Sequence, residues 1–111
     1  MIELFTTIYF AGGAGKVLRS ANMQSVYTLL LQRLYYGFKD ELQKAKDKKE
    51  IDNFMIGFTD EGYGLEIHIY SNDMKVIEKE KKFVDAVQNN WKTKYTFKMA
   101  GLSFKSEIIG G

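Results

Sequence analysis

The chain has no cysteine, no proline and a single histidine among its 111 residues. Without cysteine it has no disulfides, no thiolate zinc sites and no cysteine nucleophile. This absence fits a reducing compartment, and we expect the protein to be cytoplasmic. The sequence indicates no cofactor.

Arginine is scarce as well. The 16 basic residues include two arginines, Arg19 and Arg33, and the formal net charge is +2. A dedicated duplex-DNA-binding domain carries a larger basic excess, and specific phosphate recognition favours the arginine fork over lysine. A lysine-rich chain without proline is also typical of an AT-rich genome, which favours an inhibitor or adaptor encoded by a mobile element.

Long apolar runs are missing. No stretch approaches the length of a transmembrane helix. The N-terminal segment, with Glu3 and no early Lys or Arg, does not resemble a signal peptide. A length of 111 residues suits one domain, residues 1–111, and we expect no contact with a membrane.

The hydrophobic pattern alternates between strand and helix periods. Residues 2–10, 53–58 and 65–70 alternate with period two, whereas residues 23–48 and a segment from Asp73 onward show helical spacing. The end of the chain predicts a hairpin of residues 95–99 and 102–108 around Gly101. The predicted order is β-α-β-β-α-β-β, a ferredoxin-like order with an added C-terminal strand. The predicted fold class is α+β, a two-layer sandwich with two helices on one face of an antiparallel or mixed sheet.

A glycine run, Gly12 to Lys16, connects the first predicted strand to the first predicted helix. A P-loop has glycine where Phe10 stands and Ser or Thr where Val17 stands, so the run is not a P-loop. Backbone amides of such a turn can still hold an anion. Two hypotheses remain for this run: anion or nucleotide binding by Gly13, Gly15 and Lys16, or a plain strand-to-helix connection.

His68 is the single histidine and lies between Ile67 and Ile69 on the polar side of its predicted strand. No nucleophile or oxyanion donor accompanies it in a recognisable pattern. Its spacing from Asp60, Glu61 and Glu66 matches no metal-binding loop. The sequence therefore predicts no catalytic residue and no metal site.

One face of the predicted sheet gathers ring-bearing side chains, because the first and third strands are neighbours in a ferredoxin-like sheet. These side chains are Phe5, Tyr9, His68 and Tyr70. Lys94, Lys98 and Lys105 are expected on the polar face of the last hairpin.

Two functions suit this face. An exposed, partly apolar sheet face is a surface for a protein partner or for self-association. Rings beside lysines also suit single-stranded nucleic acid, although Glu3, Glu66 and Glu107 share the face and repel phosphate. The leading hypothesis is a small non-enzymatic binding protein that acts through protein–protein contact, and the alternative is a single-stranded nucleic-acid-binding module.

Overall fold

A computed structural model of the chain describes residues 1–10, 24–59, 64–94 and 102–110. The described residues form six elements. In chain order these are β1 (Ile2–Phe10), α2 (Gln24–Asp47), β2 (Asn53–Thr59), β3 (Gly64–Ser71), α3 (Met74–Lys94) and β4 (Leu102–Ile109).

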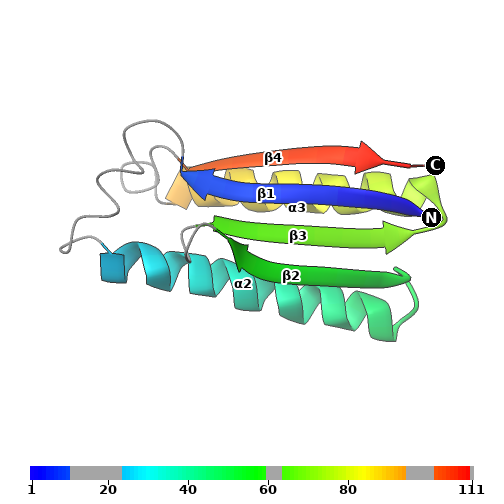
Figure 1. The fold of residues 1–111 in the computed structure, drawn as a ribbon, viewed down its shortest axis with the longest axis horizontal. Helices are drawn as coiled ribbons and strands as arrows, with labels where there is room; N and C mark the ends of the chain where they lie inside the picture. The colour runs from blue at the N-terminus through cyan, green and yellow to red at the C-terminus, as the bar shows by residue number, and fades with distance from the viewer. Residues whose placement is uncertain (11–23, 60–63, 95–101, 111) are drawn as a thin grey trace.

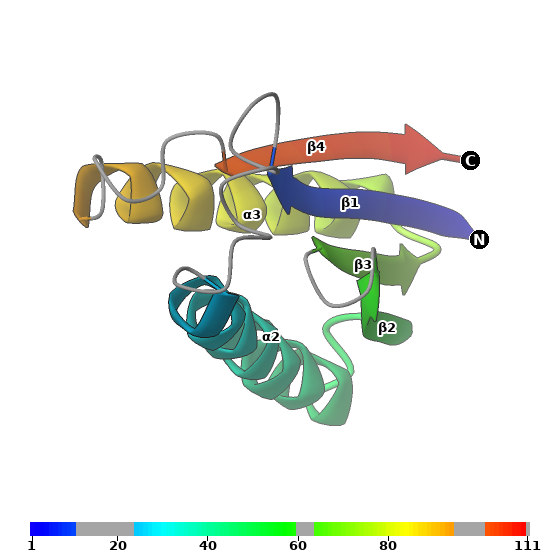
Figure 2. The same ribbon diagram turned by 60° about the vertical axis from the view of Figure 1, so that its left-hand side comes forward.

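The four strands form one antiparallel sheet in the order β2-β3-β1-β4. Both helices lie behind this sheet in Figure 1, so one face of the sheet is covered and the other is open. Figure 2 shows the two layers from another side. The predicted two-layer α+β fold is confirmed, and the six elements follow the ferredoxin-like order. The prediction contained one strand more, at residues 95–99, and that segment lies outside the described residues.

The alternation of apolar side chains explains why the sheet has one covered face. On β1, Ile2, Leu4, Thr6 and Ile8 are buried, and on β3 the same holds for Leu65, Ile67 and Ile69. Successive side chains of a strand point to opposite faces. The residues between these buried positions therefore line the open face.

The helices cover the sheet with apolar stripes of helical spacing. The buried side chains of α2 lie three or four residues apart: Leu31, Leu34, Phe38, Leu42 and Ala45. On α3, Ile77 and Val84 are buried, and Phe83 stacks on Phe38 with ring centroids 5.7 Å apart. Asp73 caps α3, because its Oδ1 accepts a hydrogen bond from the backbone amide of Lys75 at 2.9 Å.

Helix α2 is followed by a non-glycine residue in the left-handed backbone conformation. Lys49 has a φ of 60°, and the amides of Lys49 and Glu50 donate to the carbonyls of Lys46 and Ala45 at 3.0 and 2.8 Å. This pair of hydrogen bonds is the Schellman pattern, in which the left-handed position favours glycine. The backbone of Lys49 is therefore strained by its side chain.

We expect Lys49→Gly to raise the free energy of unfolding by about 0.5–1 kcal/mol, because glycine adopts a positive φ without steric cost. Urea denaturation followed by circular dichroism measures the change. Lys48→Gly is the matched control and is expected to lower stability, since Lys48 has no positive φ. A Lys49→Gly protein less stable than the parent would contradict the prediction.

Candidate functional site: the open face of the sheet

The strand register determines which side chains meet on the open face. His68 of β3 lies opposite Met55 of β2 on one side and Phe5 of β1 on the other, and Phe5 lies opposite Glu107 of β4. This row crosses all four strands. Opposed residues of neighbouring strands are close enough for their side chains to interact, so the row forms the centre of the open face.

Three of the predicted ring-bearing residues lie together, with His68 between the other two. The rings of Phe5 and His68 have centroids 4.7 Å apart, and those of His68 and Tyr70 are 6.4 Å apart and nearly parallel at 10°. All three side chains are partly buried. The structure therefore brings Phe5, His68 and Tyr70 into one cluster, which we call the ring cluster.

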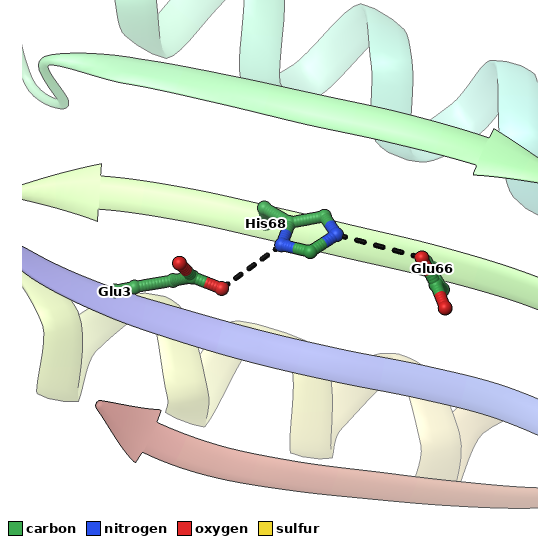
Figure 3. Close-up of polar contacts among 3 residues, drawn as sticks. All are labelled: Glu3, Glu66 and His68. Carbon is green, nitrogen blue, oxygen red and sulfur yellow. Dashed lines mark hydrogen bonds and ion pairs between the residues drawn. The ribbon is translucent and has the colours of Figure 1, made fainter.

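Two carboxylates flank the imidazole of the ring cluster (Figure 3). His68 Nδ1 lies 2.9 Å from Glu3 Oε2, and His68 Nε2 lies 3.6 Å from Glu66 Oε2. The side chains of His68 and Glu3 are each 23% exposed, whereas that of Glu66 is 43% exposed. The Glu3 contact orients the imidazole ring in a partly desolvated position, where a hydrogen bond to a charged group is stronger than in water.

Glu3 also acts on Tyr70, its opposite residue across β1 and β3. Burial raises the pKa of the Tyr70 phenol, and the negative charge and hydrogen bond of Glu3 raise this pKa further. The phenol therefore stays protonated and can donate a hydrogen bond to the Glu3 carboxylate.

The other predicted residues are more scattered. Tyr9 lies at the far end of β1, opposite Ser103, and is 38% exposed. Lys105 is exposed on the open face, opposite Thr7. The predicted position of Lys94 on the last hairpin is wrong, because Lys94 is the final residue of helix α3. Lys98 and the anion-binding candidates Gly13, Gly15 and Lys16 lie outside the described residues.

Two apolar residues of the open face were missing from the prediction. Met55 is 58% exposed on β2 and Ile109 is 46% exposed on β4. Ile109 lies opposite Glu3, so it borders the ring cluster on the β4 side as Met55 does on the β2 side. The sequence shows that these two residues are apolar. It does not show that they lie next to the rings, because this depends on the order of the strands in the sheet.

Carboxylates and aromatic rings surround the imidazole on this face. The described contacts of His68 are the carboxylates of Glu3 and Glu66 and the rings of Phe5 and Tyr70. Among the described residues, no group of three or more His, Asp or Glu side chains is placed to hold a metal ion. Among the described residues of the face, the charged side chains are those of Glu3, Glu66, Glu107 and Lys105, so carboxylates outnumber cations around the rings.

None of the described helices is long and apolar enough to cross a membrane. Comparisons with protein-family models, with curated proteins and with solved structures found no match for this chain.

Proposed function

We propose that this protein is a cytoplasmic, non-enzymatic binding protein that recognises a partner protein through the open face of its sheet. The observation that carries the proposal is the ring cluster of Phe5, His68 and Tyr70, bordered by Met55 and Ile109. Partly exposed aromatic and apolar side chains at the centre of a surface are typical of residues that dominate the energy of protein–protein binding.

The charges around the rings favour a partner surface that carries lysine or arginine. Glu3 and Glu66 lie on either side of His68, and Glu107 lies opposite Phe5 on the next strand. A cation placed over a Phe or Tyr ring is attracted by the face of the ring, and these carboxylates add to that attraction. Complementary charge also speeds the encounter of the two proteins.

The alternative is single-stranded nucleic acid. The rings of Phe5 and Tyr70 with Lys105 on the same face favour it, since stacking beside cations binds single strands. The three carboxylates oppose it by repelling phosphate. If the alternative holds, the affinity for a mixed single-stranded oligonucleotide will fall steeply as salt rises, because phosphate contacts release counterions. Fluorescence anisotropy over a salt series measures this dependence.

The test of the proposed function uses a photo-crosslinking amino acid placed at Met55, at the border of the ring cluster, in cell extract. We expect an adduct with a specific protein, and no adduct when the same group replaces the exposed Lys82 of α3. In purified form, that protein should bind Phe5→Ser/Tyr70→Ser at least about tenfold more weakly than the parent, because such anchor residues each contribute more than about 1 kcal/mol.

Met74→Ser is the matched control, because Met74 is apolar and 38% exposed at the start of α3, away from the sheet face. It should bind like the parent. Equal binding by the parent and by Phe5→Ser/Tyr70→Ser, with circular dichroism showing all variants folded, would refute the open face as the binding surface.

A further inference from the structure

A second surface lies in the helical layer, away from the sheet face. A groove of about 230 Å³ runs between α2 and α3. Its apolar lining comes from both helices and consists of Leu34, Phe38, Phe83 and Val87. Phe38 and Phe83 stack on each other within this lining.

Gly37 lines this groove in the middle of α2. Glycine inside a helix costs about 1 kcal/mol relative to alanine. Apart from its chain neighbours and the backbone of α2 itself, no atom of the described residues lies within 4 Å of the position that a Cβ at Gly37 would occupy. Packing within the described chain therefore does not require glycine here. A glycine on an exposed helix face does allow another backbone to approach closely.

Opposite charges stand symmetrically about Gly37. Arg33 and Glu41 line the same groove, and each is four residues from Gly37 along α2. Among the described residues no carboxylate forms an ion pair with Arg33, and Glu41 makes an exposed pair with Lys44 at 3.6 Å. If two α2 helices cross antiparallel at Gly37, Arg33 of each copy faces Glu41 of the other. The surface of α2 formed by Arg33, Gly37 and Glu41 is thus complementary to the same surface of a second copy, as an interface with twofold symmetry requires.

We propose that a second copy of this chain occupies this surface, with the two α2 helices crossing antiparallel at Gly37. Because Gly37 has no side chain, the two helices can approach closely there. The apolar groove beside the crossing receives side chains of the other copy. Two reciprocal Arg33–Glu41 pairs set the register. This interface leaves the open face of the sheet free, so it is independent of the proposed binding function.

Sedimentation equilibrium at low ionic strength tests the proposal by charge reversal. The parent should show twice the mass of one chain. Arg33→Glu and Glu41→Arg should each show the mass of one chain. In a dimer of either variant, positions 33 and 41 would carry the same charge, so two like-charged pairs would face each other across the interface. An equimolar mixture of the two variants should recover the doubled mass. In the mixed dimer the introduced glutamate faces the introduced arginine, and the unchanged Glu41 of one variant faces the unchanged Arg33 of the other. Added salt should weaken the parent dimer.

Gly37→Gln provides a steric test. The open space around Gly37 predicts that this variant keeps the fold, which circular dichroism checks, while its longer side chain prevents the close crossing and abolishes the doubled mass. The proposal is overturned if the parent has the mass of one chain throughout a dilution series. It is equally overturned if the charge-reversal variants or Gly37→Gln associate as the parent does, or if the mixture does not recover the doubled mass.

Discussion

Leu4→Ala is expected to lower the free energy of unfolding by about 3 kcal/mol, the usual cost of deleting a fully buried leucine side chain. Leu4 is 0% exposed on β1, an inner strand of the sheet, and lies opposite Ile69 of β3 and Ile108 of β4. Both neighbouring strands and the helical layer hold this site in place. The cavity left by the missing atoms therefore collapses little, and the cost includes the lost contacts of its lining.

Thermal denaturation followed by circular dichroism measures this loss, and we expect the melting temperature to fall by more than about 10 °C. Met55→Ala is the matched control: Met55 is also a large apolar residue of the sheet, but it is 58% exposed on the open face. Its substitution should change stability by less than about 0.5 kcal/mol. Similar losses for Leu4→Ala and Met55→Ala would contradict the assignment of covered and open faces.

Thr6→Val is expected to cost about 1 kcal/mol, because it removes a part-buried hydrogen bond between two side-chain hydroxyls. Thr6 is 0% exposed on the covered face of β1, and its Oγ1 lies 2.9 Å from Oγ of Ser106, its opposite residue on β4. This pair is a polar contact inside an apolar layer. It therefore favours the register in which Thr6 and Ser106 face each other.

A double-mutant cycle separates the hydrogen bond from the packing of the two side chains. Thr6→Val/Ser106→Ala removes both hydroxyls, so its cost should be smaller than the sum of the two single substitutions. Urea denaturation of the four proteins provides the coupling energy. If the costs of the two single substitutions were additive, the coupling energy would be zero and the hydrogen bond between the hydroxyls would not stabilise the protein.

Most helix and strand positions could be predicted because burial follows local periodicity. The alternation of Ile2, Leu4 and Ile8 with polar or aromatic residues defined β1, and the spacing of Leu31, Leu34 and Phe38 defined α2. The position of Lys94 was predicted wrongly for a related reason. Polar and apolar residues alternate from Lys94 onward, as in a strand, but the helical hydrogen bonds of α3 continue to Lys94. Element ends depend on such competition between patterns and are the least predictable part of a fold.

The ring cluster was predictable in part. Phe5, His68 and Tyr70 were expected together because the first and third strands are neighbours in a ferredoxin-like sheet, and their contacts follow from the β1–β3 register. Only one of the two carboxylates beside the imidazole was predictable. Glu66 was expected near His68, because it lies two residues away on the same strand face. Glu3 is separated from His68 by 65 residues, and no local pattern shows that its carboxylate contacts the ring.

The sequence by itself determined which residues are apolar at strand or helix spacing, and hence the elements and the covered face of the sheet, because burial selects one side of each element. The tertiary structure decided which side chains of different elements meet. Strand register placed Glu3 beside His68 and Tyr70, and the arrangement of α2 and α3 placed Phe83 beside Phe38 in the groove between the two helices. Such encounters depend on how the whole core packs, since the pairing of distant segments is selected by the burial of all of them together.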